Sequence, residues 1–419
     1  MKILLRALPF TGVAIVLLNG GAQAGTGKTL YSFLGGAYGG TPMAGVYVDG
    51  TDNLFGTLSD IYSKNKHENG IVYELKGQGG KWTQKTLHEF HPNKGDGARP
   101  TGALIPDGTG ALYGTTFIGG QSGGGIVFKL APPAGGRGAW SYSILYSFNA
   151  NTEGNGTGGG LIFDSKGSLY LTHEGVGVQG YGTVSVLTPP AQGEAAWTNS
   201  TIYTFQGGAD GDAPSGQPLV FDANGSLYGV TQLGGGGTLC SGGNGCGTVY
   251  KLTPPAQGSG PWTETILYAF TGGADGAMPN SNLVFDKNGN LFSTTYSGGT
   301  NNFGTLFELS PPANGQTNWT ETVVHSFADN GSDGYWPQGN TIMTNTGNLL
   351  ISALGGDAGG DGAIIQFTPP PGKGAWSQKL LYSFYGANGA QPIGMTLDPS
   401  GIIYGTTLFD YGVAFKVHP

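Results

Sequence analysis

The sequence Trp262-Thr-Glu-Thr-Ile-Leu-Tyr-Ala-Phe270 opens a block that continues through Leu283-Val-Phe285, Leu291-Phe-Ser-Thr-Thr295 and Gly304-Thr-Leu-Phe-Glu-Leu309. All four segments are short, rich in β-branched and aromatic residues, and bounded by Gly, Pro and Asn, as β-strands are. Glycine-rich loops follow the first and third segments, and a short turn follows the second. The block therefore predicts four consecutive strands.

The same block recurs along the chain with a regular period. Its leading tryptophan returns at intervals of 58, 57, 65, 57 and 57 residues, at Trp82, Trp140, Trp197, Trp262, Trp319 and Trp376. The third strand begins seven times, at Leu54, Leu112, Leu169, Leu227, Leu291, Leu349 and Ile403. A period of about 56 residues fits a four-stranded propeller blade and is too long for leucine-rich or tetratricopeptide units. The sequence therefore predicts an all-β, seven-bladed β-propeller of four-stranded blades.

The two ends of the chain predict how the ring closes. Lys28-Thr-Leu-Tyr-Ser-Phe33 matches the first strand of the block without its tryptophan, and Gly412-Val-Ala-Phe-Lys-Val417 matches the fourth. If each blade runs second, third, fourth and first strand from the inside outward, the N-terminal strand completes the last blade. Closure leaves no circumferential strand edge unpaired. The alternative, an open β-solenoid, has no need of complementary ends.

Residues 1–24 have the features of a secretory signal peptide. Lys2 and Arg6 precede an apolar run, and Ala22-Gln-Ala24 supplies a small-x-small cleavage site. The run is shorter than the roughly 20 residues that a spanning helix needs. We therefore expect cleavage near Ala24, a single propeller domain over residues 25–419, no remaining transmembrane segment, and a secreted or periplasmic location.

Composition narrows the classes of partner. The 82 glycines and 24 prolines fill about a quarter of the 419 positions, while only 11% of residues are charged and the formal net charge is −8. Loss of Lys2 and Arg6 with the leader makes the charge −10, which would repel nucleic acid and anionic lipid. We expect no nucleic-acid partner.

The repeat resembles that of the bacterial GloVer tandem repeat proteins, whose pattern is LYSF, then FDxNGNLYGTT, then GGGTVFKLTP. Close copies are Phe221-Asp-Ala-Asn-Gly-Ser-Leu-Tyr-Gly229, Leu112-Tyr-Gly-Thr-Thr116 and Gly247-Thr-Val-Tyr-Lys-Leu-Thr-Pro254. The resemblance covers nearly all of the mature chain and implies an exported bacterial propeller, but it implies no activity or functional residue. Many members end in a surface-sorting anchor. None precedes Pro419, so we expect a soluble periplasmic or secreted form.

Several recurring motifs are interpreted as structural. Asp-x-x-Gly lacks the further carboxylates of a calcium loop and predicts hairpin turns, at Asp107, Asp164, Asp222, Asp286 and Asp398. Pro-Pro pairs end the fourth strand in five units, because proline cannot donate to a strand ladder. His88 and His325 take the place that tyrosine holds in the first strand of the other units, which indicates packing.

Cys240 and Cys246 are the only cysteines, and they lie in the one unit that is longer than the others. No His or third Cys accompanies them, so in an exported protein they predict a disulfide and no metal site. On the chain-entropy model such a short closure stabilises by about 2 kcal/mol at most. We expect the disulfide to stiffen an inserted loop.

Strand order sorts the loops between two faces of the ring. The Asp-x-x-Gly turns and Pro-Pro connections share one face, and the long loops after the first and third strands share the other, here called the glycine-rich loop face. Propellers bind ligands where loops from all blades converge over the channel. Binding residues predicted there are Asp96, Arg99, His173, Glu174, Asp210, Asp212, Asp275, Asp333 and Trp336. The same loops carry Asp60, His67, Glu68, Glu153, Tyr335, Asp357, Asp361 and Asp410.

Two classes of function fit these features. The first is an exported, monomeric, non-catalytic binding or scaffolding propeller that engages a glycan, a peptide or a protein, without a cofactor. The alternative is a hydrolase or lyase acting on an extracellular carbohydrate or related polymer. It would need His or carboxylates where the inner strands enter the channel, yet the residues expected there are Thr101, Gly159, Gln217, Asn282, Asn340 and Gly394. His173 and Glu174 are the best acid/base pair, but neighbours on a strand face opposite ways. We therefore expect binding and no catalytic residue.

Overall fold

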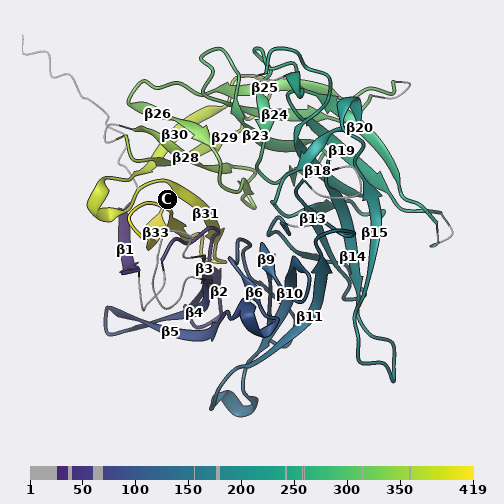
Figure 1. Cartoon of the computed structure of the whole chain (residues 1–419). Coiled ribbons are helices and arrows are strands. Elements are labelled where there is room, and N and C mark those ends of the chain that lie inside the picture. Colours follow the sequence, from purple (N-terminus) through teal and green to yellow (C-terminus); the bar gives the residue numbers. More distant parts are fainter. Residues whose placement is uncertain are drawn as a thin grey trace, which may run out of the picture.

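The computed structural model describes residues 26–35, 40–59, 69–154, 156–175, 180–240, 243–256, 258, 260–313, 316–357 and 360–419. The proposed leader, Asp60, His67 and Glu68 lie outside these ranges. Seven antiparallel sheets stand around a central axis like the blades of a wheel (Figure 1). The seven-bladed propeller predicted from the repeat is confirmed.

Blades 1 and 3 follow the predicted strand order from the axis outward, and blade 2 adds two short strands, β6 and β9, to that order. Blade 1 contains β2 (Tyr47–Val48), β3 (Leu54–Leu58), β4 (Ile71–Gln78) and β5 (Lys81–Glu89). Blade 2 contains β6 (Gly97–Ala98), β7 (Ile105–Pro106), β8 (Leu112–Thr116), β9 (Ile118–Gly119), β10 (Gly123–Ala131) and β11 (Ser141–Asn149). Blade 3 contains β12 (Ile162–Phe163), β13 (Leu169–His173), β14 (Thr183–Thr188) and β15 (Thr198–Thr204).

In the next three blades the innermost strand is split in two. Blade 4 contains β16 (Asp212–Pro214), β17 (Val220–Phe221), β18 (Leu227–Leu233), β19 (Thr248–Thr253) and β20 (Thr263–Ala269). Blade 5 contains β21 (Ala277–Pro279), β22 (Val284–Phe285), β23 (Leu291–Ser297), β24 (Thr305–Ser310) and β25 (Thr320–Ser326). Blade 6 contains β26 (Ser332–Pro337), β27 (Ile342–Met343), β28 (Leu349–Asp357), β29 (Ala363–Thr368) and β30 (Ser377–Ser383). Short 3₁₀ turns cover Pro92–Lys94, Ala134–Gly136, Gly208–Asp210 and Gly386–Asn388.

Blade 7 is built from both ends of the chain. It contains β31 (Pro392–Leu397), β32 (Ile403–Thr407), β33 (Val413–His418) and, outermost, β1 (Thr26–Ser32). The register of the closing pair sets Thr26 opposite His418 and Lys28 opposite Lys416. Ring closure by the N-terminal strand is therefore confirmed.

A phenylalanine at the outer end of every blade fills the space toward the next one. All seven are buried: Phe33, Phe90, Phe148, Phe205, Phe270, Phe327 and Phe384. Phe33 meets Tyr73 of blade 1 edge-to-face at 5.1 Å, and Phe270 meets Phe307 of blade 5 at the same distance. Such aromatic pairs add about 0.5–1.5 kcal/mol beyond the apolar area that they bury. The core is thus a set of similar interfaces between blades.

A β-bulge interrupts the outermost pair of strands at the same place in every blade. In blade 1, Val72 pairs with His88 and Tyr73 pairs with Thr86, so Leu87 is the extra residue. The corresponding extra residues are Leu30, Leu145, Ile202, Leu267, Val324 and Leu381. A bulge re-aims the side chains beyond it, and here the residue directly after the bulge is a tyrosine or a histidine, as His88 is in blade 1.

The turns predicted from Asp-x-x-Gly are confirmed. In each, the aspartate accepts the backbone N–H groups two and four residues later, at 2.8 and 3.0 Å for Asp107. The following glycine has a left-handed backbone, with φ of 83° at Gly110 and 84° at Gly289. The Pro-Pro pairs follow directly on β10, β14, β19, β24 and β29, so they end strands as expected.

Candidate functional site

Five carboxylates of the glycine-rich loops form hydrogen bonds with the outermost strand of their own blade. A tyrosine or histidine near the strand end contacts a carboxylate seven or eight residues later, which also accepts a backbone N–H of the turn between them. The side-chain distances are 2.9 Å for His88–Asp96, 2.6 Å for Tyr146–Glu153, 2.5 Å for Tyr203–Asp210, 3.1 Å for Tyr268–Asp275 and 2.9 Å for His325–Asp333. Like the tyrosines at the equivalent positions, His88 and His325 therefore have a carboxylate as their partner.

Several of these carboxylates also bind the next blade. Their partner lies two residues after the phased tryptophan: Tyr142 O–H donates to Asp96, Asn199 Nδ2 donates to Glu153 over 2.9 Å, and Gln378 Nε2 donates to Asp333 over 2.8 Å. Asp96 and Asp333 are only 7% and 5% exposed. Carboxyl groups this deeply buried require such hydrogen-bond partners in place of water. The hydrogen-bonding capacity of these predicted binding residues is used at blade junctions.

Two junctions contain a second carboxyl group, contributed by the following blade. Tyr203 O–H lies 2.5 Å from Asp210 Oδ1 and 3.1 Å from Glu264 Oε2. Burial and the neighbouring Asp210 raise the pKa of Glu264 to about 8, and burial with Asp275 raises the pKa of Glu321 to about 7. One phenolic proton cannot satisfy two ionised carboxylates, so Glu264 keeps its own proton at neutral pH.

His173 and Glu174 face different surroundings, as their alternation along a strand predicts. His173 is fully buried at the end of β13, with its ring 4.5 Å from that of Phe148. Burial lowers its pKa to about 4, so this imidazole is neutral at pH 7. Glu174 lines the central channel, where burial raises its pKa and a backbone hydrogen bond from Gly216 partly opposes that shift. The two side chains do not form an acid/base pair.

Arg99 and Trp336 occupy equivalent positions in their blades, and the residue there has a left-handed backbone. This position, here called the left-handed ring, contains Thr41, Arg99, Gly156, Ala213, Met278, Trp336 and Gln391, with φ between 52° and 69°. In six blades a proline follows. The backbone N–H donates to the preceding blade, for example from Trp336 to the carbonyl of Phe303 over 3.0 Å. The strain of a non-glycine residue at positive φ is thereby held by an inter-blade hydrogen bond.

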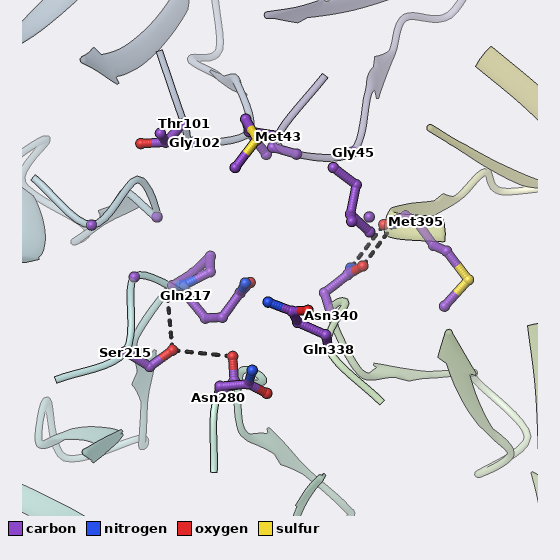
Figure 2. A pocket seen from close by; sticks show the side chains of 18 of the residues that line it. Met43, Gly45, Thr101, Gly102, Ser215, Gln217, Asn280, Gln338, Asn340 and Met395 are labelled. Atoms are coloured by element: carbon purple, nitrogen blue, oxygen red, sulfur yellow. Dashed lines mark hydrogen bonds between the residues drawn. The ribbon is translucent and has the colours of Figure 1, made fainter. Parts of the chain in front are cut away.

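Two residues further along, every blade lines the central channel. These seven residues, here called the channel ring, are Met43, Thr101, Gly158, Ser215, Asn280, Gln338 and Ile393. With their neighbours they enclose a cavity of about 410 Å³ (Figure 2). Phe117, Glu174, Gln232 and Leu408, which come from the ends of third strands, line it too. The cavity therefore lies toward the glycine-rich loop face.

Side-chain amides and hydroxyls dominate the polar chemistry of this cavity. Figure 2 shows the amides of Gln217 and Gln338 extending into the opening. Thr101 Oγ1 and Asn280 Oδ1 are buried and have no hydrogen-bond partner within the described part of the chain. Because both atoms are buried, a ligand in the cavity does not reach them without a shift of their side chains. Among the described lining residues, Glu174 alone is ionisable.

Close backbone contacts and hydrogen bonds fix the blades around the cavity. A Cβ on Gly102 would lie 1.7 Å from the carbonyl oxygen of Gly159 in the next blade. On the other side of the ring, Asn340 donates to the carbonyl of Met395 over 2.8 Å and accepts its N–H over 2.7 Å. Of the six residues expected at the channel, Thr101, Gln217, Asn340 and Gly394 line the cavity, whereas Gly159 and Asn282 contact the neighbouring blade.

A family model describes the whole repeat array. The Gloeobacter/Verrucomicrobia repeat matches residues 18–240, 137–313 and 236–419. The chain belongs to the Gloeobacter/Verrucomicrobia repeat family. The family expected from the repeat motifs is thereby confirmed, and no curated protein matches the sequence.

Solved structures that resemble this family member share its fold at low sequence identity. A protein from Lactobacillus plantarum is 15% identical with a TM-score of 0.56, over 88% of this chain and 92% of that one. A putative 6-phosphogluconolactonase from Bacteroides uniformis is 15% identical with a TM-score of 0.52, over 85% and 88%. PorZ, a surface component of the type-IX secretion system of Porphyromonas gingivalis, is 12% identical with a TM-score of 0.53, over 92% and 47%. At these identities the likeness shows the fold alone.

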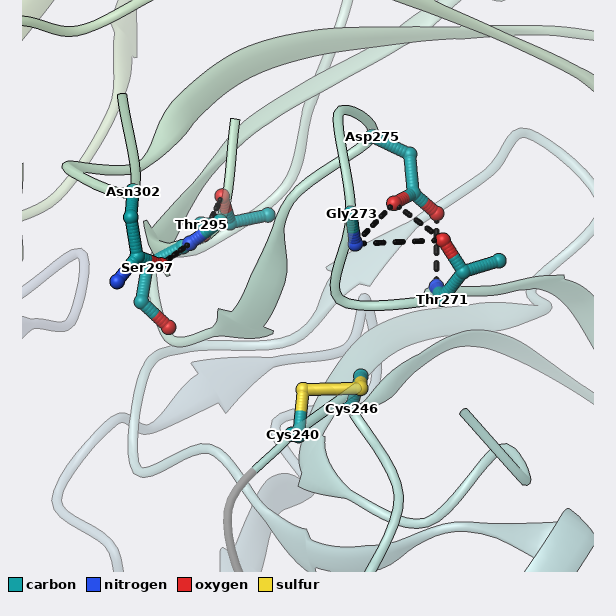
Figure 3. Close-up of a disulfide and its surroundings, with 9 residues drawn as sticks. Cys240, Cys246, Thr271, Gly273, Asp275, Thr295, Ser297 and Asn302 are labelled. Atoms are coloured by element: carbon teal, nitrogen blue, oxygen red, sulfur yellow. Dashed lines mark hydrogen bonds between the residues drawn. A yellow bond between two sulfur atoms is a disulfide. The ribbon is translucent and has the colours of Figure 1, made fainter. Parts of the chain in front are cut away.

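The predicted disulfide is formed in the loop that lengthens the fourth blade. Cys240 and Cys246 are bonded, with 5.4 Å between their Cα atoms. Figure 3 places the disulfide beside the turn that contains Thr271, Gly273 and Asp275. A Cβ on Gly272 would lie 2.6 Å from the sulfur of Cys246, which is itself fully buried. The disulfide thus closes a part of the inserted loop and lies against the turn that follows β20.

The remaining polar residues named from the sequence are dispersed. Asp212 begins β16, where burial raises its pKa, and Asp361 accepts the backbone N–H of Gly386 over 2.6 Å. Within the described ranges, no three His, Cys, Asp or Glu side chains come together as metal ligands do, and no helix has the length and apolar character of a membrane span. Of the nine predicted binding residues, Glu174 lines the cavity.

The channel ring and the left-handed ring were not identified as sets from the sequence. Six members of the left-handed ring stand directly before a proline, and the channel ring lies one residue beyond that proline. Alignment of the seven repeats on this proline would have found both. The prolines most visible in the sequence, the Pro-Pro pairs, mark the opposite face.

Proposed function

We propose that this chain is an exported, non-catalytic binding propeller whose ligand sits over the channel mouth on the glycine-rich loop face. The proposal rests on a contrast between equivalent positions of the seven blades. The buried core position between blades is phenylalanine in all seven. The channel ring has seven different residues in seven blades, and so does the left-handed ring.

The side chains of the left-handed ring are not explained by random variation at unconstrained surface positions. Glycine adopts a left-handed backbone without strain, whereas other residues pay a steric penalty there. Blade 3 has Gly156 at this position and so avoids the steric penalty, yet the other six blades have a residue with a side chain. Thr41 is buried, but the other five side chains are at least partly exposed, and their presence at a strained position supports a role at the surface.

The cavity chemistry supports binding of an uncharged polar ligand. Fixed amides and hydroxyls that converge on a concave site give orientation and specificity. Because the seven blades present different side chains, the ligand would be held in one orientation.

The proposed location outside the inner membrane draws support from two features. Residues 1–24 have the composition of a leader, and Cys240 is bonded to Cys246, as is common in oxidising compartments. Fractionation of the native host, followed by N-terminal sequencing of the mature protein, tests this location. Recovery in the cytoplasm with residues 1–24 intact would contradict it.

One observation favours a second candidate, a hydrolase or lyase acting on an extracellular carbohydrate. Glu174 is the single ionisable side chain among the described lining residues, and burial raises its pKa. A carboxyl group whose pKa is raised by burial is better suited to act as a general acid than an ordinary one. In that case Glu174→Gln would abolish turnover and leave binding intact.

The experiment that tests the binding proposal compares ligand affinity between matched variants. The purified protein is titrated calorimetrically with oligosaccharide and peptide panels, and so is the double variant Gln217→Ala/Gln338→Ala. The control is Gln316→Ala, an exposed glutamine in the loop after the Pro-Pro pair of blade 5. We expect the double variant to lose affinity at least tenfold and the control to match the wild type. Equal affinity in all three proteins would overturn the proposal.

A further inference from the structure

The junction of blades 5 and 6 departs from the repeat at the channel mouth. Trp336, Tyr335, Phe303 and Tyr296 form one aromatic cluster there. Tyr296 stacks on Trp336 with ring centroids 5.9 Å apart and planes 19° apart, and Tyr335 meets Trp336 at right angles at 4.8 Å. Phe303 lies 5.2 Å from Tyr335. The other members of the left-handed ring are Thr, Arg, Gly, Ala, Met and Gln, so this cluster belongs to one junction.

Trp336 occupies its position at a conformational cost. Its φ is 55°, and a bulky residue in this region is an outlier. Its ring is nevertheless 37% exposed, which places it among the most exposed aromatic side chains of the described chain. Packing alone would favour a buried ring or a glycine at this position. A strained, partly exposed indole indicates a contact surface.

The aromatic cluster adjoins the cavity along the chain, although its four rings are not among the residues that line it. The amide of Gln338 extends into the opening. Gln338 lies two residues after Trp336, so their Cα atoms are about 7 Å apart at most. Tyr296 directly follows the buried core of β23, the position from which Phe117, Glu174, Gln232 and Leu408 line the cavity in other blades. One elongated ligand could therefore contact the indole and the cavity amides together.

We propose that the Trp336 cluster and the channel amides form a binding site for a neutral oligosaccharide. This inference rests on the proposed function and names its ligand class. A pyranose ring has an apolar face of C–H groups, which stacks on an aromatic ring, and a rim of hydroxyls that donate and accept hydrogen bonds. Trp336 supplies the apolar surface. Gln338 and Gln217 supply amides, each of which both donates and accepts.

Charge favours a neutral saccharide over other polymers. The chain has a formal net charge of −8, which disfavours polyanions such as uronic-acid polymers or nucleic acid. Among the described lining residues only Glu174 is ionisable, so the cavity has no paired charges for a strongly cationic ligand. A peptide could use the same amides, but its backbone does not match the indole face as a pyranose does.

The test measures binding of cellohexaose, laminarihexaose and maltohexaose, with a random hexapeptide library as the competing class. Titrations use the wild type, Trp336→Ala, Trp336→Phe and Gln338→Ala, with Gln316→Ala, an exposed residue on the opposite face, as the control. We expect at least one hexasaccharide to bind, with affinity at least tenfold lower in Trp336→Ala and Gln338→Ala. Trp336→Phe, which keeps an aromatic ring, should stay within about threefold of the wild type, and Gln316→Ala should be unchanged.

The outcomes separate this inference from the general proposal. If peptides bind, hexasaccharides do not, and Gln338→Ala weakens peptide binding, the channel site stands and the saccharide inference is wrong. If no hexasaccharide binds up to millimolar concentration, or if binding is equal in every folded variant, the saccharide inference is also wrong. Circular dichroism of Trp336→Ala and Trp336→Phe establishes that a loss of affinity does not reflect unfolding.

Discussion

The hydroxyl group of Tyr203 illustrates how single residues hold this molecule together. It lies within hydrogen-bonding distance of a carboxylate in its own blade, Asp210, and of one in the next blade, Glu264. At the equivalent junctions, Asn199 and Gln378 provide amides in place of Glu264 and can donate without a proton from solvent. Glu264 must therefore be protonated before it can donate a hydrogen bond, as the amides of Asn199 and Gln378 do at the other junctions.

The first prediction concerns the pH dependence of stability at this residue. The carboxyl group of folded Glu264 keeps its proton to about pH 8, whereas an ordinary glutamate loses it near pH 4.5. The folded state then binds more protons, so the stability that Glu264 provides is complete below pH 4.5 and is lost as pH rises through 8. Glu264→Gln should be more stable than the wild type at pH 8, by on the order of 1 kcal/mol after allowance for solvent screening. Thermal unfolding at pH 5 and pH 8 measures this.

Asn199→Asp provides the reverse control for the same junction chemistry. It places a second carboxyl group beside Glu153, as Glu264 does beside Asp210. The stability of this variant should therefore fall as the pH rises, whereas Asn199 itself does not titrate. A Glu264→Gln protein with the same pH profile as the wild type would contradict the assignment of the shared proton.

At the scale of elements, the inner strands of adjacent blades approach so closely that only glycine fits. Gly102 faces the carbonyl of Gly159, and Gly216 faces the carbonyl of Gly158 at 1.9 Å from its would-be Cβ. Elsewhere in the ring, two hydrogen bonds between the Asn340 side chain and the Met395 backbone take the place of this contact. The channel diameter is thus set by backbone contacts on one side and by hydrogen bonds from side chains on the other.

The second prediction is that Gly102→Ala destabilises the propeller strongly. The added methyl group would overlap backbone that cannot move without shifting a whole blade, so we expect a loss of about 3 kcal/mol or more. Gly108→Ala is the matched control, because its Cβ would meet no atom within 4 Å and its φ is not left-handed. Denaturant unfolding should place Gly108→Ala within about 0.5 kcal/mol of the wild type. Equal stability of the two variants would contradict the close approach.

Sequence patterns predicted the elements well where a local rule applied. The phased tryptophans located the outer strands, Asp107 and its equivalents located the turns, and Cys240 with Cys246 located the disulfide. The role of Asp96 and Asp333 could not be predicted in this way. Their partners Tyr142 and Gln378 are 46 and 45 residues away, and only the packing of one blade on the next brings them together. The bulge at Leu87 and its equivalents was missed, because strand alternation does not reveal an unpaired residue.

At the scale of the whole molecule, closure of the ring depends on one strand from the N-terminal end. β1 pairs with β33 along its length, and Phe33 then packs on Tyr73 of blade 1. The third prediction is that Lys28→Cys/Lys416→Cys forms an intramolecular disulfide under mild oxidation, since directly opposed residues on antiparallel strands have the required Cα separation. Lys28→Cys/Lys287→Cys, which joins β1 to a turn of blade 5, should not cross-link. Mass spectrometry of peptides distinguishes the two.

The asymmetry of the channel mouth is also a property of the whole ring. Identical phenylalanines between the blades hold a nearly sevenfold scaffold, while the channel ring and the left-handed ring differ in every blade. Sequence analysis predicted binding on the glycine-rich loop face, but four of its nine predicted binding residues are carboxylates that contact the outermost strand of their own blade: Asp96, Asp210, Asp275 and Asp333. Thr101, Gln217, Asn340 and Gly394 were expected at the channel from the sequence, and the closed ring adds the other lining residues to them.

Hydrogen–deuterium exchange of the protein with and without the tightest-binding hexasaccharide or hexapeptide tests most directly where this propeller binds. We predict slower exchange in residues 99–104 and 336–341, which form the channel mouth, and unchanged exchange in the turns at 107–110 and 286–289 on the opposite face. Protection of those turns, with no change at the channel mouth, would contradict the account.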